Sequence, residues 1–202
     1  MLKSFVARHL SAPKGVAGSI IFRFMNKQNM QVYEEALNLL DPSGDENILD
    51  IGCGNGIVLN MLAKRHGGKL VGIDISESII KNAIKRNRPY VKEGRMAFFQ
   101  QDATSMSFES GAFCKAFSIN TVYFWDDLDT TLTEIARILK PSGVFVNALY
   151  TNETLDTFGH TKHGYKRFAE EELIEAGRKA GFSVKTAPIM DGAAYACLYT
   201  KE

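Results

Sequence analysis

Three glycines and one aspartate follow one another between residues 48 and 56. In ILDIGCGNG a short apolar run that holds Asp50 leads into Gly52, Gly54 and Gly56. Glycine has no side chain, so such a turn lets the backbone approach a ligand closely. The spacing is GxGxG, whereas dinucleotide-binding turns show GxGxxG. A carboxylate at Asp50 would be a poor neighbour for a pyrophosphate, and it suits a ligand with a positive group instead.

Two further acids stand at the ends of the next two apolar runs. Asp74 ends VGID, where a carboxylate can accept hydrogen bonds from both hydroxyls of a ribose. Asp102 follows RMAFFQQ and could accept a bond from an adenine amine. Each has a simpler role as well: Asp74 could start a helix beside Ser76, and an acid placed like Asp102 is more often a turn residue. The order of the three acids is therefore more informative than any one of them.

Alternating strands and helices must position these residues. We expect strands at 47–51, 69–74, 95–100, 112–119 and 144–150, and helices at 30–40, 56–65, 76–87, 126–140 and 170–181. This alternation predicts a parallel sheet with helices on both faces. A last pair of strands, 182–187 and 193–200, should form an antiparallel hairpin. Ligands bind outside the carboxyl ends of such strands, which places the working residues at 50–56, 74–76, 101–103 and 120–125.

Composition limits the range of functions. The 202 residues suffice for one well-cored domain, and a net charge of +1 gives no electrostatic argument for nucleic acid as a partner. No apolar run approaches the roughly 18 residues that a membrane span needs. Cys53, Cys114 and Cys197 are odd in number and lack CxxC spacing. We therefore expect neither a zinc site nor a disulfide framework, and a cytoplasmic setting is the simplest interpretation.

The first 33 residues differ from the rest in charge. Five basic residues precede Glu34, which is the first acid: Lys3, Arg8, Lys14, Arg23 and Lys27. A transit peptide would look partly like this, although a basic surface segment is favoured. We divide the chain into a basic N-terminal segment, 1–29, which could fold over the site as a lid, and a domain at 30–202.

The order and spacing of these segments resemble the class I S-adenosylmethionine-dependent methyltransferases. The resemblance covers about residues 30–200 and rests on ILDIGCGNG, VGIDIS, QDA, EIARILKPSG and EEELIEAGRKAGF. It is generic, and its nearest branch includes the ubiquinone/menaquinone-biosynthesis C-methyltransferases, which act on small molecules. It implies a Rossmann-like α/β fold. The sheet would have seven mostly parallel strands in the order 3-2-1-4-5-7-6, with strand 7 antiparallel and helices on both faces. S-adenosylmethionine would be the cofactor.

The resemblance also implies roles at the methionine end of that cofactor. The backbone at Gly52 and Gly54 would approach the methionine part, and Asp50 would orient the turn near the amino group. Cys53 would serve as a small residue that fits the turn. Asn120, after the fourth strand, could touch the methionine part or the substrate.

The resemblance implies that residues at the ends of the second and third strands would bind the nucleoside part of the cofactor. Asp74 would hold the ribose hydroxyls, and Ile75 would lie against the adenine. Asp102 would accept a bond from the adenine amine, with Ala103 close by. No metal ligand is implied.

The residues after the fourth strand, where the methyl group would react, differ from those of one branch of the family. Amino- and amide-directed N-methyltransferases carry an Asn/Asp-Pro-Pro-aromatic motif here, whereas this chain has Asn120-Thr121-Val122-Tyr123 without either proline. The N-methylation mechanism is therefore not implied. Tyr123 is expected to line the pocket, near a sulfonium that aromatic faces would attract. Phe124 and Trp125 are expected to pack under the next helix.

Other polar residues near the site allow two interpretations. His160 and His163 could act as a general base, or they could lie on a solvated surface. Three acids at the start of the helix after 125 are expected to complement the positive end of the helix rather than bind a metal: Asp126, Asp127 and Asp129.

The sequence thus predicts a methyltransferase for a small-molecule acceptor, working as a monomer or homodimer. Alignment for in-line displacement can supply roughly 7–11 kcal/mol, so no shared catalytic residue is required. One alternative is a nicotinamide-dependent oxidoreductase, which the glycine spacing and Asp102 argue against. The other is a non-catalytic cofactor-binding partner subunit.

Overall fold

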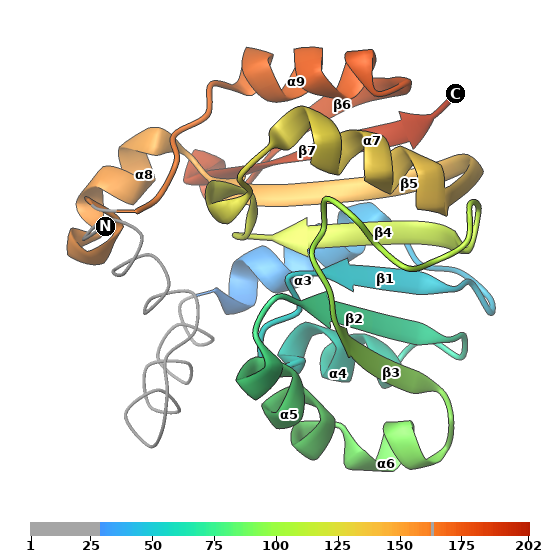
Figure 1. Cartoon of the computed structure of the whole chain (residues 1–202). Helices are drawn as coiled ribbons and strands as arrows, with labels where there is room; N and C mark the ends of the chain where they lie inside the picture. The colour runs from blue at the N-terminus through green and yellow to red at the C-terminus, as the bar shows by residue number, and fades with distance from the viewer. Residues whose placement is uncertain (1–28, 163) are drawn as a thin grey trace.

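A seven-stranded sheet forms the centre of the computed structural model, which describes residues 29–162 and 164–202 (Figure 1). The strand order is β3-β2-β1-β4-β5-β7-β6, as predicted. Strands β1 to β5 are parallel, and β7 runs antiparallel to both β5 and β6. The strands are β1 (Ile48–Ile51), β2 (Leu70–Asp74), β3 (Met96–Gln100), β4 (Phe113–Ile119), β5 (Leu139–Tyr150), β6 (Phe182–Ile189) and β7 (Ala194–Lys201).

Helices cover both faces of this sheet. In Figure 1, α7 lies in front of the strands and α3 behind them. Helix α3 packs against β4 and β5, α5 against β2 and β3, and α9 against β6. The helices are α3 (Met30–Leu40), α4 (Ile57–Ala63), α5 (Glu77–Arg86), α6 (Arg88–Lys92), α7 (Leu128–Ile138), α8 (Asn152–Thr157) and α9 (Glu170–Lys179). None of the helices in the described ranges has the length and apolar character needed to cross a bilayer.

The start of α7 shows what the acid cluster does locally. The Asp127 side chain caps the helix, since its Oδ1 accepts a bond from the backbone N–H of Thr130 at 2.9 Å. Asp129 lies in the first turn and Arg137 in the last, where their charges complement the helix dipole. The predicted helix-start role of Asp127 and Asp129 is confirmed. The predicted helix 126–140 is shorter in the structure, because β5 already begins at Leu139.

The segment after β5 is folded rather than a plain polar connection. Thr151 caps α8 by accepting a bond from the N–H of Thr154, and a short 3-10 helix, η2 (Gly159–Lys162), follows. The sequence analysis also missed α6, which starts at a proline-containing turn. Ser76 does precede α5, but its hydroxyl meets Ser78 instead of capping the helix.

Two predictions concern residues whose placement the structure does not describe. The proposed lid falls outside the described residues, apart from Asn29. His163 also lies outside them, and the side chain of His160 is not described.

A buried asparagine ties α5 to the glycine turn. Asn87 is fully buried, and its Nδ2 donates to the carbonyls of Gly56 and Ala83, each at 3.0 Å. Its Oδ1 accepts a bond from Asn60 Nδ2 at 2.9 Å. No sequence pattern predicts this link, because an asparagine at a helix end suggests only a cap. Through Asn87 the turn that follows β1 is fixed to two helices.

We predict that Asn87→Ala destabilises the fold through this link. The substitution leaves two carbonyls and one amide without their buried partner, at a cost of about 1–3 kcal/mol in the free energy of unfolding. Urea unfolding measures it. Asn60→Ala is the matched control, since it removes only one of the three bonds and should cost less. Equal effects of the two substitutions would contradict the assigned role of Asn87.

Candidate active site

The carboxyl ends of the central strands surround one large cavity of about 550 Å³. All nine residues predicted to bind the cofactor line it: Asp50, Gly52, Cys53, Gly54, Asp74, Ile75, Asp102, Ala103 and Asn120. Tyr123, Phe124 and Trp125 line it as well. The structure therefore brings together the nine predicted cofactor residues and Tyr123, and it does not describe the side chain of His160. Their individual roles remain predictions.

The glycine turn is held by the end of the neighbouring strand. The N–H groups of Gly52 and Cys53 both donate to the carbonyl of Ile73 at 2.9 Å. The N–H of Gly54 donates to Asp74 Oδ2 at 3.2 Å. Gly52 and Gly54 have φ values of +75° and +52°, a conformation in which a side chain is strained. The turn thus presents bare backbone to the cavity.

The two glycines differ in what surrounds them. A Cβ on Gly52 would lie 2.5 Å from Thr121 Cγ2, so this glycine is needed for packing. A Cβ on Gly54 would meet nothing within 4 Å. Gly54 therefore faces open space in the cavity, and a ligand can approach its backbone.

Asp50 is buried beneath this turn with an unpaired oxygen. The residue is 3% exposed, and within the described residues its Oδ2 has no hydrogen-bond partner. Burial, and secondly the charge of Asp74, raise the pKa of Asp50 well above its ordinary value. An unpaired carboxylate oxygen beside a cavity suits a ligand that carries an ammonium group. The amino group of S-adenosylmethionine is such a group, so Asp50 fits the predicted cofactor.

Asp74 and Asp102 are arranged differently at the nucleoside end. Asp74 accepts backbone bonds with both oxygens, from Gly54 and from Ser76 (2.9 Å), and burial nevertheless raises its pKa. Each carboxylate oxygen can accept a further bond, so ribose hydroxyls can still bind there. Asp102 shapes its own turn through Oδ1, which accepts from the N–H and the hydroxyl of Thr104. Between the two acids Ile75 is 67% exposed, as a surface for a flat base would be.

Cys53 behaves as a small residue of the turn. It is buried, and burial, followed by the charges of Asp50 and Asp74, raises the pKa of its thiol. A protonated thiol is a weak nucleophile. All three cysteines of the chain are free.

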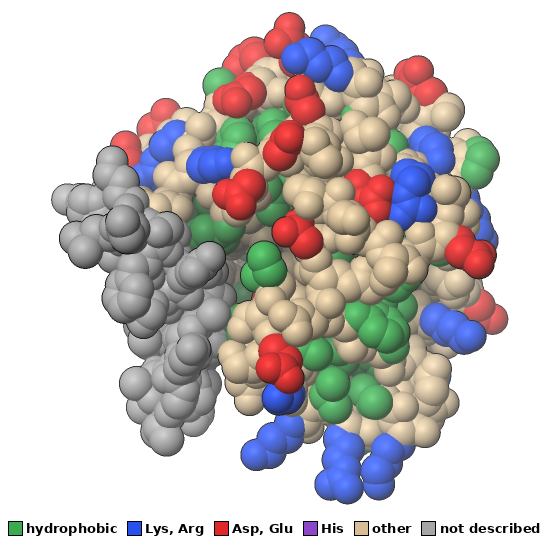
Figure 2. Space-filling view, in the orientation of Figure 1, with side chains coloured by type: hydrophobic (Ala, Val, Ile, Leu, Met, Phe, Trp, Pro, Cys, Tyr) green, Lys and Arg blue, Asp and Glu red, His purple; other side chains and the backbone are tan. Residues whose placement is uncertain are grey.

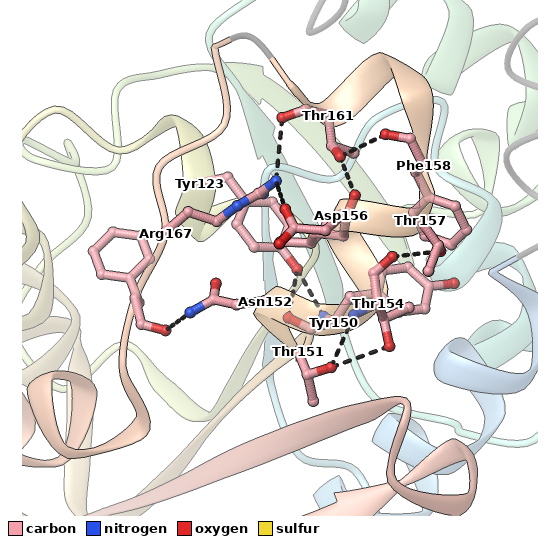
Figure 3. A network of polar contacts seen from close by, with 12 residues as sticks. Tyr123, Tyr150, Thr151, Asn152, Thr154, Asp156, Thr157, Phe158, Thr161 and Arg167 are labelled. Atoms are coloured by element: carbon pink, nitrogen blue, oxygen red, sulfur yellow. Dashed lines mark hydrogen bonds and ion pairs between the residues drawn. The ribbon is translucent and has the colours of Figure 1, made fainter.

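A chain of hydrogen bonds supports the other end of the cavity. The hydroxyl of Tyr123 accepts a bond from the backbone N–H of Tyr150 at 2.7 Å (Figure 3). Asn120 Oδ1 lies 3.3 Å from the same hydroxyl. Asn29 Oδ1 accepts bonds from the Tyr150 hydroxyl at 2.7 Å and from Asn120 Nδ2 at 3.4 Å. Burial raises the pKa of Tyr123 strongly, which keeps it a neutral phenol. The Tyr123 hydroxyl is thus placed to hold the side chain of Asn120 in position.

Sequence reasoning missed several residues of this end. Asn29, Tyr33 and Tyr150 line the cavity but lie far apart in the chain, at the start of α3 and the end of β5. The only sequence signal for Tyr150 is its place at the carboxyl end of a parallel strand, where ligands bind. Asn29 and Tyr33 carry no comparable signal.

Comparisons with known proteins agree with this geometry. Residues 48–143 match the family described as "Methyltransferase domain". "O-methyltransferase resE" of Aspergillus sclerotiorum is 31% identical over 155 residues, which are 72% of this chain and 58% of that protein. Among solved structures, the geranyl diphosphate C-methyltransferase of Streptomyces coelicolor, in complex with S-adenosyl-L-homocysteine, superposes with a TM-score of 0.70 at 16% identity. The superposition covers 83% of this chain and 75% of the Streptomyces chain.

The chain contains a class I S-adenosylmethionine-dependent methyltransferase domain. S-adenosylmethionine is the cofactor of such a domain, and the residues that face the cavity fit it.

Another relative has a different named activity. "Arginine-hydroxylase NDUFAF5, mitochondrial" of Mus musculus is 31% identical over 140 residues, 69% of this chain and 36% of that protein. The chain thus spans 36% and 58% of the lengths of the mouse and fungal relatives.

We predict opposite effects of Asp50→Asn on stability and on cofactor binding. The pKa of Asp50 is higher in the folded protein than in the unfolded chain. Asp50 therefore lowers the free energy of unfolding as the pH rises from the ordinary aspartate pKa through the pKa of the folded state. The variant removes this cost, so the apoprotein should gain about 1 kcal/mol at pH 8 and nothing at pH 4. Binding of S-adenosylmethionine should weaken at least about tenfold, since a charge-assisted bond is lost. Thermal unfolding and calorimetry measure the two effects, and unchanged binding would contradict the role of Asp50.

We also predict that Gly52→Ala destabilises the protein more than Gly54→Ala. Both variants strain a positive φ, at about 1–3 kcal/mol each. Only Gly52→Ala adds a clash with Thr121, so its unfolding midpoint in urea should be the lower of the two. Gly54→Ala should instead reduce cofactor affinity more than its stability loss explains. A lower unfolding midpoint for Gly54→Ala than for Gly52→Ala would contradict the assigned packing of Gly52 against Thr121.

Proposed function

We propose that this chain transfers the methyl group of S-adenosylmethionine to a small-molecule acceptor. The observation that carries the proposal is the buried Oδ2 of Asp50, which has no partner among the described residues, in the same cavity as the open backbone of Gly54. An ammonium group there would satisfy an oxygen that is otherwise costly to bury. The neighbouring Asp74 and Asp102 supply acceptors for a nucleoside along the same edge of the sheet.

The chain's own residues would mainly orient the reactants. S-adenosylmethionine supplies an activated methyl group on a sulfonium. Asp50, Asp74 and the glycine turn would fix its two ends, and Asn120, held by Tyr123, would border the space where the acceptor enters. Asp50 and Tyr123 are buried, which excludes water from their side chains. Alignment of this kind can lower the barrier by roughly 7–11 kcal/mol, so a base is needed only for an acceptor that must lose a proton.

Several features support a small acceptor. A cavity of about 550 Å³ lies in the range of small-molecule sites, roughly 300–1,000 Å³. The net charge of +1 gives no attraction for nucleic acid. The fungal relative is named an O-methyltransferase, which makes oxygen acceptors the first class to test.

We extend the proposal to the organisation of the protein. Residues 1–29 would form a basic segment next to the domain at 30–202, and the active species would be a monomer or a homodimer. A cytoplasmic setting agrees with the three free cysteines, whereas the mouse relative is named as mitochondrial. Light scattering and localisation of a tagged chain test these points.

The first experiment is calorimetry with S-adenosylmethionine and S-adenosylhomocysteine on wild type, Asp74→Ala and the exposed control Asp45→Ala. We expect both ligands to bind wild type and the control equally. Loss of the ribose acceptor should weaken binding by at least about tenfold in Asp74→Ala.

The same samples separate the competing functions. Release of S-adenosylhomocysteine with oxygen acceptors would establish methyl transfer, and cofactor binding without turnover on any acceptor would favour a partner subunit. A folded wild type that binds NADH but neither sulfur ligand would overturn the proposal in favour of an oxidoreductase.

A further inference from the structure

The part of the cavity beyond the predicted cofactor residues has an aromatic wall. Six side chains form this wall, and we use the term for them alone: Tyr33, Tyr123, Phe124, Tyr150, Phe158 and Tyr165. The rings touch one another at angles typical of aromatic contacts: Phe124 and Tyr165 at 4.8 Å between centroids, and Tyr150 and Phe158 at 5.3 Å. Burial raises the pKa of Tyr123, Tyr150 and Tyr165, so the wall is uncharged at neutral pH.

The charges around this wall are of one sign. Among the described residues that line the cavity there is no lysine, arginine or histidine, whereas Asp126 and Asp127 line it beside the wall. Figure 2 shows acidic side chains gathered over the start of α7, next to exposed hydrophobic surface. A phosphate or carboxylate of an acceptor would therefore meet negative charge and no positive partner among these residues.

Two described cations that follow Tyr165 in the chain, Lys166 and Arg167, make contacts within the protein. The Nζ of Lys166 donates to the carbonyls of Trp125 and Asp126, the latter at 2.9 Å. Arg167 pairs with Asp156 at 3.0 Å and also contacts the carbonyl of Thr161 (Figure 3). Lys166 is held by its two carbonyl partners. Arg167 Nη1 is buried without a partner among the described residues, but neither Arg167 nor Lys166 lines the cavity.

A cationic acceptor is also unfavourable at this end. The reacting methyl group sits on a positively charged sulfonium, which repels a second cation. An ammonium group lacks the lone pair that a nucleophile needs. Aromatic faces and the two acids could attract a cation, but only away from the reacting carbon.

We propose that the acceptor is an uncharged, planar aromatic molecule that binds against the aromatic wall. This inference rests on the proposed function, because it names the substrate class of the same site. Apolar ring surface would replace water at six side chains, and each ring pair can contribute about 0.5–1.5 kcal/mol beyond the buried area. The charges of the described lining residues would disfavour phosphorylated, carboxylated and ammonium-bearing acceptors.

The protein contains its own probe for this test. Trp125 is the only tryptophan in the sequence, and it lines the cavity beside the wall. Quenching of its fluorescence can therefore report binding near the wall. We would titrate the full chain, saturated with S-adenosylhomocysteine at pH 7, with 2-naphthol, 2-naphthyl phosphate and 2-naphthylmethylammonium, three probes that share one ring system.

We expect 2-naphthol to bind at least about tenfold more tightly than either charged probe. Tyr165→Leu should weaken 2-naphthol binding about threefold to tenfold and leave the affinity for S-adenosylhomocysteine unchanged. Phe108→Leu is the matched control: Phe108 is half-buried, packs on Phe99 and Phe113, and does not line the cavity. Should Tyr165→Leu lose S-adenosylhomocysteine binding as well, Phe124→Leu takes its place.

The outcomes separate this inference from the function beneath it. Tighter binding of the phosphate or the ammonium probe would overturn it, as would equal 2-naphthol binding by wild type and the wall variant. In these cases retained S-adenosylhomocysteine binding leaves the proposed function standing. A folded protein that does not bind S-adenosylhomocysteine would overturn both.

Discussion

The closure of the glycine turn against the end of β2 is the constraint on which the site depends. Two backbone N–H groups of the turn converge on one carbonyl, that of Ile73, and a third reaches the carboxylate of Asp74. These bonds can form only if the turn adopts positive φ at Gly52 and Gly54 and packs without a side chain on Thr121. Asn87 then joins the turn to α4 and α5. Sheet, helices and cavity are thus coupled through a few backbone contacts.

That closure has an energetic consequence for the two acids. Bringing the turn onto Asp74 places Asp50 beneath it, away from water and close to a second carboxylate, and the pKa of each is raised. The apoprotein therefore holds an unfavourable arrangement that a ligand with positive charge relieves. Part of the cofactor's binding energy would come from removing this cost. A site of this type trades stability for affinity.

The three acids at the cofactor part of the site could be predicted from sequence, and the acceptor end only in part. Asp50 and Asp74 lie in the last two residues of β1 and β2, and Asp102 comes shortly after β3. Parallel strands bring their carboxyl ends to one edge, so periodicity alone places the three acids together. Tyr150, Asn29 and Tyr165 come from three segments whose meeting depends on how α8 and η2 fold. The segment 151–168 lacks a clear period, and its fold depends on local caps, on contacts of Arg167 within the segment and on the contact of Lys166 with Asp126. Such contacts leave no pattern in one sequence.

The same contrast explains why relatives of similar sequence can differ in their named activities. The matched family region ends at residue 143, before three of the six residues of the aromatic wall and before Lys166. The strand ends and the glycine turn must keep their geometry for any ligand with a nucleoside and an amino acid part. The segment after β5 is fixed by side-chain bonds that can change without disturbing the sheet. Fold and cofactor site therefore depend on the same strand ends, whereas the proposed acceptor wall can change without altering either of them.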